Sequence, residues 1–336
     1  MRVIHCGIAG DLPGGMAQVV NEYLSWTVAG LEQGYLLTTK GKRDPLSPLR
    51  SARAASAIVA MRRARARTLL IFHISERGSF LREGLLLLLA RWLGFRCIAQ
   101  VHGANFDQFA ARYPKFVGYI LRKASRTLVL SERSRRAAFH LGIDALRVNN
   151  PVWVPQENDV GGKEEIVLFC GEVSLRKGVD VLLDAWSRLR EVGDWKLIVV
   201  GPGQLPMSGF FPDGIENVGA LSHESAMEVC ARASIAILPS RDEALPMFIL
   251  EAMARRCAVI STPVGQIDSV LADGCGIIVP VGDAVATATA LQRLIDSDKL
   301  RRELGDSARR KVIAEYSSDV VSARLVSIWR EVLGER

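Results

Sequence analysis

The sequence of 336 residues lacks several features that define specialised classes of protein. It has no run of about 18 uncharged apolar residues, which a membrane-spanning helix needs. Its most hydrophobic run, residues 84–90, lies between Arg82 and Arg91 and suits a buried helix. Residues 1–6 show no hydrophobic core or cleavage site of a signal peptide, so we expect them to form a first strand.

The six cysteines form no C-x-x-C pair, and most of them lie within apolar segments. This pattern favours reduced, buried thiols over a disulfide framework or a zinc site. We therefore expect a cytoplasmic protein without a structural metal ion.

Charge is unevenly distributed along the chain. Residues 1–160 contain 23 Lys and Arg against 11 Asp and Glu, a net charge of +12, whereas the remainder contains 20 against 25, a net charge of −5. Such asymmetry is expected of two domains with different partners. A basic N-terminal part suits an anionic membrane surface or a phosphorylated acceptor, although a solvated arginine-rich surface fits equally well. The four arginines Arg62, Arg63, Arg65 and Arg67 are the candidates for contact with lipid. No nucleic-acid-binding motif is present, so nucleic acid is not an expected partner.

Strand-like apolar runs alternate with amphipathic segments along the chain. In the first half, the predicted strands are residues 1–8, 35–38, 69–73, 97–102 and 127–130, with helices near 16–29, 50–66, 80–94, 113–124 and 132–141. After a polar stretch at 155–164, the predicted strands are 166–170, 195–200, 235–239, 258–261 and 276–279, with helices near 178–190, 223–233 and 246–256.

This alternation is typical of parallel sheets that are covered on both faces. The sequence therefore predicts an α/β protein with two Rossmann-like, doubly wound domains facing a central cleft, at residues 1–155 and 164–316. Ligands of such sheets bind beyond the carboxyl ends of the strands. The terminal segment 317–336 has apolar residues at helical spacing, and we expect this helix to pack back on the N-terminal domain.

The most informative segment is residues 240–254, which follows the predicted strand 235–239. Pro246 stands where a helix begins, and the first N–H groups of that helix form an anion-binding site. Glu243 precedes the helix, and Glu251 interrupts its apolar run. An unpaired carboxylate is costly there, which favours a functional role over an exposed helix face.

Two other strand ends carry candidate ligand-binding residues. Arg176 and Lys177 follow the strand 166–170 and could neutralise a diphosphate without a divalent ion, although two exposed cations at a turn are the simpler interpretation. Gly14 and Gly15 follow the first strand and would let the backbone approach a ligand closely. Their spacing does not match the dinucleotide-binding fingerprint, so a nicotinamide cofactor is not expected.

Residues 73–79 and 100–106 also follow predicted strands and could face the cleft. His102 precedes a glycine at a strand end and is better placed than the other histidines, although a single histidine is more often a core residue. Asp296-Ser297-Asp298 matches the D-x-D of metal-dependent sugar transferases. It lies between two late helices, and we interpret it as a loop and helix cap.

Taken together, these segments resemble the retaining GT-B glycosyltransferases of family four. The resemblance covers nearly the whole chain, and its most specific element is an E-x7-E motif matched by Glu243 and Glu251. The turn Lys177-Gly178 and the strand end at 199–203, which contains Gly201, are also similar to that family. Residues 73–106 resemble members that build exopolysaccharide or O-antigen repeat units.

The resemblance implies roles for individual residues. The catalytic residues would be His102 beside the reaction centre, Lys177 on the diphosphate and Glu243 on the donor sugar. The residues expected to bind the donor are Gly14, Gly15, Arg176, Lys177, Gly201, Leu245, Pro246, Met247 and, on the ribose, Glu251. The residues expected to bind the acceptor are His73, Arg77, Ser79 and Phe106. The family usually has arginine where this chain has Glu172, so either Arg176 replaces that cation or Glu172 is a structural partner of Arg176 or Lys177.

The implied function is a retaining, metal-independent hexosyltransferase that needs no cofactor. It would move a hexosyl unit from a UDP- or GDP-hexose to a lipid-linked saccharide in polysaccharide biosynthesis, at the cytoplasmic face of the membrane. Two alternatives stay open: a GT-B-fold sugar-nucleotide epimerase, and a catalytically inactive subunit that binds sugar nucleotides.

Overall fold

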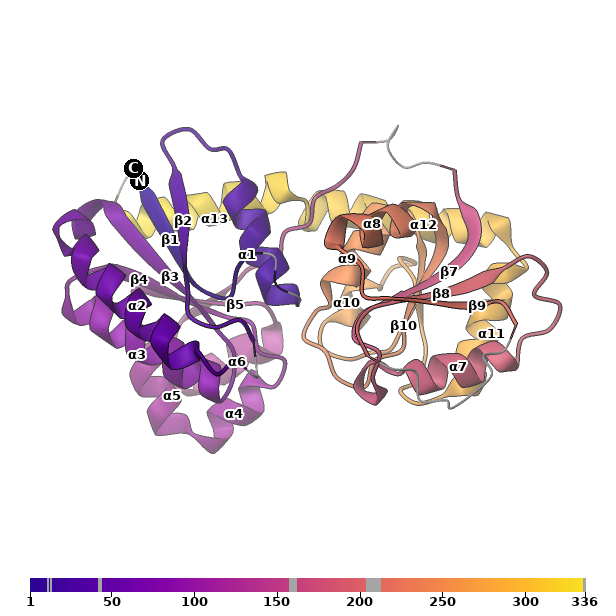
Figure 1. Ribbon diagram of the computed structural model, residues 1–336, viewed down its shortest axis with the longest axis horizontal. Coiled ribbons are helices and arrows are strands. Elements are labelled where there is room, and N and C mark those ends of the chain that lie inside the picture. The colour runs from indigo at the N-terminus through magenta and orange to yellow at the C-terminus, as the bar shows by residue number, and fades with distance from the viewer. Residues whose placement is uncertain (11, 13, 42–43, 157–161, 204–212, 335–336) are drawn as a thin grey trace. The chain divides into compact units, whose positions relative to one another are not determined.

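A computed structural model describes residues 1–10, 12, 14–41, 44–156, 162–203 and 213–334 (Figure 1). The chain divides into two compact units. Unit 1 comprises Met1–Pro151 and Ser318–Arg336, and unit 2 comprises Val152–Ser317. Each unit contains one parallel sheet with helices on both faces. The predicted class, two Rossmann-like α/β domains, is therefore confirmed.

The sheet of unit 1 has the strand order β2-β1-β3-β4-β5-β6 within the described residues. Its strands are β1 (Arg2–Gly7), β2 (Glu32–Leu37), β3 (Thr68–Ile74), β4 (Arg96–Val101), β5 (Arg126–Val129) and β6 (Ala145–Arg147). Its helices are α1 (Gly15–Ser25), α2 (Ser47–Ala60), η1 (Met61–Arg67), α3 (Gly78–Trp92), α4 (Phe106–Arg112), α5 (Pro114–Leu121), α6 (Glu132–His140) and α13 (Ser318–Leu333).

Alternation along β1 and β3 divides the core of unit 1 into two layers. Ile4 of β1 and Phe72 of β3 join a cluster with residues of α2, α3 and α5 on one face of the sheet. His5 and His73 lie on the other face, where the His5 ring lies 5.4 Å from Tyr23 of α1 and 5.7 Å from Trp329 of α13, centroid to centroid. All seven residues of β3 are buried because both faces are covered.

The sheet of unit 2 has the order β12-β11-β10-β7-β8-β9 within the described residues. Its strands are β7 (Glu164–Cys170), β8 (Lys196–Val200), β9 (Ile215–Gly219), β10 (Ala233–Leu238), β11 (Ala258–Ser261) and β12 (Ile277–Ile278). Its helices are η3 (Leu175–Lys177), α7 (Val179–Ser187), α8 (His223–Arg232), α9 (Met247–Ala254), α10 (Ile267–Val270), α11 (Ala284–Ile295) and α12 (Asp298–Glu315).

Both sheets have a topological switch point, where successive connections leave in opposite directions. In unit 2 it lies between the parallel neighbours β7 and β10, and in unit 1 between β1 and β3. Ligands of doubly wound sheets bind beyond the carboxyl ends of the strands at such points. The fold thus directs attention to the loops that follow these four strands.

Several predicted elements differ in detail. The helix expected at 50–66 ends at Ala60 and continues as the 3-10 segment Met61–Arg67. The helix expected at 113–124 is α5, and Pro114 starts it, directly after the separate helix α4. The edge strand β9 was not predicted because its residues, Ile-Glu-Asn-Val-Gly, are mostly exposed and do not form an apolar run.

None of the helices in the described ranges has the length and hydrophobicity needed to cross a membrane. The six cysteines are free thiols, and five of them are buried, as their apolar sequence surroundings predict. Ser297 of the D-x-D segment caps α12 by accepting a hydrogen bond from the N–H of Leu300, which confirms its interpretation as a helix cap.

Candidate functional site

A nearly buried ion pair lies at the switch point of unit 2. Lys177 ends η3 after β7, and Glu243 lies in the loop between β10 and α9. Lys177 Nζ is 2.5 Å from Glu243 Oε1, and the two side chains are only 13% and 11% exposed. Arg176 Nη1, at 3.1 Å, and Ser240 Oγ, at 3.3 Å, donate hydrogen bonds to the same oxygen. One carboxylate oxygen therefore receives three donors at the ligand-binding edge of the sheet.

Close backbone contact holds the two loops of this pair together. Gly178 has a φ of +75°, and a Cβ there would lie 1.9 Å from the carbonyl oxygen of Pro239. The N–H of Arg241 donates to the carbonyl of Arg176 at 2.8 Å. Arg241 also forms two 2.7 Å bonds to the carboxylate of Asp180. Only glycine fits between these loops, and this fixes where Lys177 and Glu243 meet.

Glu172 is a partner of Arg176. Arg176 Nη2 lies 3.2 Å from Glu172 Oε2, and Arg176 Nη1 also donates to the carbonyl oxygen of Asp242 at 3.0 Å. Both charged side chains are substantially exposed, so the pair adds at most about 1 kcal/mol. Of the two interpretations of Glu172 left open by the sequence, its position fits a structural partner of Arg176.

Glu251 lies in the second turn of α9 and is 5% exposed. Its Oε1 is 3.6 Å from His223 Nε2, and burial lowers the pKa of that histidine. Burial raises the pKa of the Cys170 thiol at the end of β7 to about 12; the Glu251 charge adds to this shift, and Lys177 opposes it. Glu251 and Lys177 therefore both act on the end of β7, and the two glutamates of the motif share one edge of the sheet.

The start of α9 can contact a ligand only through its backbone N–H groups. Leu245, Pro246 and Met247 are all buried, so their side chains pack inward, and the helix begins at Met247. The first N–H groups of a helix lack partners within it and attract anions. Gly265, which the sequence analysis missed, lies with φ +64° against this loop; a Cβ there would be 2.1 Å from the carbonyl oxygen of Ala244.

Gly201 follows β8 at the same edge. A Cβ at this position would lie 1.8 Å from the carbonyl oxygen of Gly171, and its φ is +143°. The N–H of Gly201 donates to the carbonyl of Gly219 at 2.7 Å. Gly201 thus allows the loops after β7 and β8 to approach each other, which is a structural role beside the donor-binding role predicted for it.

In unit 1, three histidines from neighbouring strands form a hydrogen-bonded chain. His5 Nδ1 lies 3.0 Å from His73 Nε2, and His73 Nδ1 lies 2.9 Å from His102 Nε2. Burial lowers the pKa of His5 and of His102 to about 4, and it lowers the pKa of His73 in the same direction. The three imidazoles are therefore neutral at pH 7. His102 is the one of the three that is partly exposed.

Burial corrects part of the predicted acceptor site. His73 is 1% exposed and Phe106 is 0% exposed, so neither side chain can touch a solvent-borne acceptor in this conformation. Ser79 Oγ accepts from the N–H of Ser75 and donates to Glu83 Oε2, each at 3.0 Å. Arg77 is exposed at the start of α3 with a φ of 56°.

Other residues of this edge follow from the backbone. Gly14 and Gly15 are exposed where α1 begins. Glu76 lies in the candidate segment 73–79 but was not predicted as a site residue. Its Oε1 accepts from the N–H of Asn105 at 2.8 Å and links the loops after β3 and β4. A Cβ at Gly103 would lie 2.1 Å from that oxygen, so the small residue after His102 makes room for the carboxylate.

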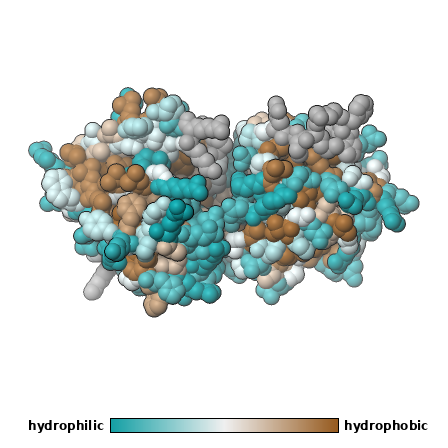
Figure 2. Space-filling model, turned by 90° about the horizontal axis from the view of Figure 1, so that it is seen from below, coloured by the Kyte–Doolittle hydropathy of each residue, from teal (hydrophilic) through white to brown (hydrophobic). Residues whose placement is uncertain are grey.

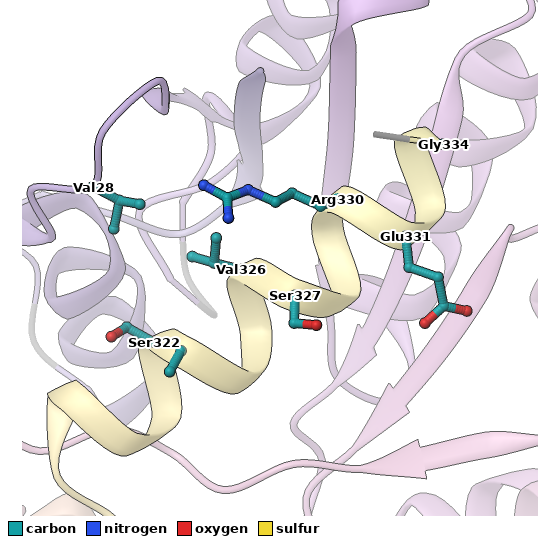
Figure 3. A pocket seen from close by; sticks show the side chains of 8 residues that line it. Val28, Ser322, Val326, Ser327, Arg330, Glu331 and Gly334 are labelled. Atoms are coloured by element: carbon teal, nitrogen blue, oxygen red, sulfur yellow. The ribbon is translucent and has the colours of Figure 1, made fainter. Parts of the chain in front are cut away.

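A surface pocket of about 850 Å³ lies in unit 1 beside α13 (Figure 3). Glu331, which lines it, bonds at 2.8 Å to Arg126, the first residue of β5, and Val28 precedes the start of β2. The pocket therefore lies where strands begin. Because ligands of parallel sheets bind at the opposite, carboxyl edge, we do not assign this pocket to the substrate.

No three His, Cys, Asp or Glu side chains gather as a metal-binding group in the ranges that the structure describes.

Comparison with known proteins finds similarity to one family over part of the chain. Residues 164–297 match the family model described as glycosyl transferases group 1. Alpha-D-kanosaminyltransferase of Streptomyces kanamyceticus is 25% identical over 73% of this chain and 73% of its own length. Phosphatidyl-myo-inositol mannosyltransferase of Mycobacterium leprae is 30% identical over 61% of this chain and 59% of its own length.

The fold is also similar to that of solved structures. Anabaena HepE, solved in complex with UDP and glucose, superposes with a TM-score of 0.76 at 13% identity and covers 98% of this chain and 100% of its own. The chain is therefore similar in sequence to glycosyltransferases of this group, and the likeness to HepE shows the two-domain Rossmann-like fold. The family match contains Lys177, Glu243 and Glu251 of the glycosyltransferase motif, whereas His102 and the other candidates of unit 1 lie outside it.

Proposed function

We propose that the protein is a retaining glycosyltransferase that moves a hexosyl unit from a UDP- or GDP-hexose to a saccharide acceptor without a metal ion. The observation that carries the proposal is the ion pair of Lys177 and Glu243 at the switch point of unit 2, beside the start of α9. In this pair, the Lys177 ammonium that would bind a diphosphate lies in direct contact with the Glu243 carboxylate that would accept hydrogen bonds from sugar hydroxyls.

Donor binding would exchange partners within this cluster. The diphosphate carries charge that Lys177, Arg176 and the first amides of α9 can bind. Once phosphate oxygens take over Lys177 and Arg176, the Glu243 carboxylate is released to accept hydrogen bonds from sugar hydroxyls. Glu251, on the same edge, would accept from the ribose hydroxyls.

In the transfer step, the protein stabilises the negative charge that develops on the leaving diphosphate. The bond between the anomeric carbon and the diphosphate oxygen breaks, and its electron pair leaves with the diphosphate. Lys177 and Arg176 stabilise that negative charge. The acceptor hydroxyl attacks the oxocarbenium-like carbon from the face that the diphosphate leaves, and its proton passes to a diphosphate oxygen. Configuration is therefore retained, and Glu243 positions the sugar without bonding to it.

The relatives support a sugar donor of this kind. The two sequence relatives are named for transfer of a kanosaminyl and of a mannosyl unit, and Anabaena HepE was solved with UDP and glucose. The mycobacterial relative is named for a phosphatidyl-inositol acceptor, which favours a lipid-linked saccharide here too.

The surface of unit 1 favours a membrane-bound acceptor. Leu81, Leu85 and Trp92 form an exposed stripe at helical spacing along α3, being 49%, 57% and 81% exposed. Helix α3 packs against α2 and α5, and α5 exposes Phe116 and Tyr119. Figure 2 shows hydrophobic areas mixed with hydrophilic ones on the face of unit 1 seen from below.

The segments of unit 1 that carry this stripe and adjoin it are rich in cations. Exposed basic residues on α3 and on the segments near it in the chain or packed against it are Arg53, Arg62, Arg63, Arg65, Arg67, Arg91, Lys115, Arg122 and Lys123. Apolar side chains interleaved with cations bind the headgroup region of anionic membranes. We therefore propose that the protein acts in the cytoplasm at the inner face of the membrane, on a lipid-linked saccharide in polysaccharide biosynthesis.

The test is a transfer assay with a panel of UDP- and GDP-hexoses and a polyprenyl-diphosphate-linked sugar, in the presence of EDTA. We expect one donor to give product whose new linkage has the donor's anomeric configuration by proton NMR. An inverted linkage would refute retention, and a strict need for magnesium would refute metal independence.

Incubation with the donor alone separates the alternatives. An epimerase would isomerise the nucleotide sugar without an acceptor, whereas an inactive binding subunit would bind the donor and leave it unchanged even when acceptor is present.

A further inference from the structure

The histidine chain of unit 1 starts from a fixed hydrogen-bond acceptor. Gln33 of β2 lies 3.1 Å from His5 through its Oε1 and His5 Nε2. Its Nε2 donates to the carbonyl oxygen of Tyr23 at 2.6 Å and lies 3.5 Å from that of Trp26. Backbone carbonyls only accept, so the amide nitrogen of Gln33 must face them. The amide orientation is thereby fixed, with Oε1 towards His5.

This orientation determines every proton in the chain. Because Gln33 Oε1 only accepts, His5 Nε2 must carry a proton. A neutral imidazole has a single N–H, so His5 Nδ1 is an acceptor and His73 Nε2 must donate to it. By the same step, His73 Nδ1 accepts from His102 Nε2. The unprotonated Nδ1 is then the one ring nitrogen of His102 that the chain leaves for a ligand.

The surroundings keep the three rings in line and neutral. His5 and His73 are each 1% exposed, and the Trp329 ring of α13 covers His5. Tyr23 lies 6.0 Å from His73, centroid to centroid. A Cβ at Gly7 would lie 3.1 Å from His73 Cβ, so this glycine lets β1 and β3 bring the rings together. No carboxylate is hydrogen bonded to any of the three rings in the described residues, and burial disfavours a second proton on each ring.

We propose that Gln33, His5 and His73 are positioning residues that hold His102 in its Nε2–H tautomer, so that His102 Nδ1 accepts a hydrogen bond from a hydroxyl of the bound sugar. The sugar ligand rests on the proposed function, whereas the tautomer of His102 does not. His102 follows β4 at the carboxyl edge of its sheet, where a ligand of this fold is expected.

The tautomer is tested without any activity measurement. In protein labelled with ¹⁵N-histidine, two-bond proton–nitrogen correlation NMR distinguishes a protonated from an unprotonated ring nitrogen, and a His102→Gln sample assigns the signals. At pH 7 we expect an unprotonated Nδ1 and a protonated Nε2 for His102. A protonated Nδ1 would overturn the proposal whether or not the protein transfers sugar.

A matched pair of variants tests whether Gln33 sets the tautomers of the histidine chain. Gln33→Met keeps the approximate shape and removes the acceptor beside His5 Nε2. Gln292→Met makes the same change on α11 of unit 2, away from the histidines, and we expect it to keep the wild-type tautomer and activity. In Gln33→Met, the His102 signals should average over both tautomers. Transfer should then fall by about twofold or more, because half the molecules present an N–H to the sugar.

Two results would contradict the role of Gln33. One is an unchanged tautomer in Gln33→Met with melting temperature at the wild-type value. The other is a Gln292→Met variant in which the His102 tautomers average as strongly as in Gln33→Met. Absence of transfer in the wild-type protein would instead count against the proposed function and leave the tautomer measurement standing.

Discussion

Among single residues, Glu243 connects the groups that the proposed chemistry needs. Its Oε1 receives Lys177, Arg176 and Ser240, all from the loops after β7 and β10. A carboxylate engaged in this way is a weak nucleophile, which agrees with a role in holding sugar hydroxyls. We therefore expect Glu243 to contribute to transfer through its charge and its hydrogen bonds. Substitution by glutamine keeps the shape of the side chain and removes the charge, so it separates the two contributions.

We predict that Glu243→Gln lowers kcat/KM for transfer by about tenfold or more, which corresponds to about 1.4 kcal/mol. The amide keeps the shape but loses the charge that balances two cations and accepts from the sugar. The matched control is Glu216→Gln, which breaks the exposed pair with Lys196 at the other edge of the same sheet. Equal, wild-type rates in both variants would remove Glu243 from the site.

The sequence selects residues of both units, including His73 and His102, but it does not show that three histidines form a chain. Glu243, Glu251 and Lys177 were selected because they follow predicted strands and match the E-x7-E motif and the Lys-Gly turn of the family that the chain resembles. His5, His73 and Gln33 meet because β1 lies between β2 and β3. Strand order is a property of the whole sheet, and no local pattern in the sequence contains it. Burial of Phe106 and His73 was missed for the same reason.

Among secondary-structure elements, the turn between η3 and α7 sets the geometry of the site. Gly178 has a φ of +75° and nearly touches Pro239, whereas Gly193, with a φ of +60°, has open space around its Cα. The two glycines therefore separate backbone strain from collision with a neighbouring loop.

We predict that Gly193→Ala costs about 1 kcal/mol of unfolding free energy, from strain alone. Gly178→Ala should cost more than about 2 kcal/mol, because the Cβ must displace the loop after β10. Urea unfolding measures both changes. Equal losses would mean that the approach of the two loops does not matter for stability.

Helix α3 carries the prediction for the membrane. The double change Leu85→Glu and Trp92→Glu puts charge into the exposed stripe and should lower binding to vesicles with anionic lipid, measured by sedimentation. The control is Val285→Glu, because Val285 is 60% exposed on α11 of unit 2 and lies outside the stripe. Binding that the double change leaves intact would refute the assignment of this surface.

On the scale of the whole molecule, the two units respond differently to acid. The buried histidine chain belongs to unit 1, where the folded-state pKa of His5 is about 4 against an ordinary value of 6.5. The unfolded chain therefore binds protons first as the pH falls. The stability that the neutral rings contribute is complete above pH 6.5 and is lost between pH 6.5 and 4.

We predict that unit 1 loses stability between pH 7 and pH 5, by about 2 kcal/mol from His5 alone. The lowered pKa values of His73 and His102 act in the same direction as that of His5. The raised pKa of the buried Glu83 acts in the opposite direction, but it is a single group, whereas three histidines lose stability in acid. Hydrogen exchange followed by mass spectrometry reports β3 and β7 separately. In unit 2, His223 also has a lowered pKa and acts in the same direction, so β7 should accelerate less than β3. Equal acceleration in the two strands would contradict a main source in unit 1.

The central claim is that unit 2 holds the diphosphate of a sugar donor through Lys177, and calorimetric titration of UDP and GDP in EDTA tests it most directly. We expect one of the two to bind the wild-type protein and to bind Lys177→Ala at least about tenfold more weakly, with Lys196→Ala unchanged. If neither nucleotide binds, or if Lys177→Ala binds as tightly as the wild-type protein, the account is wrong.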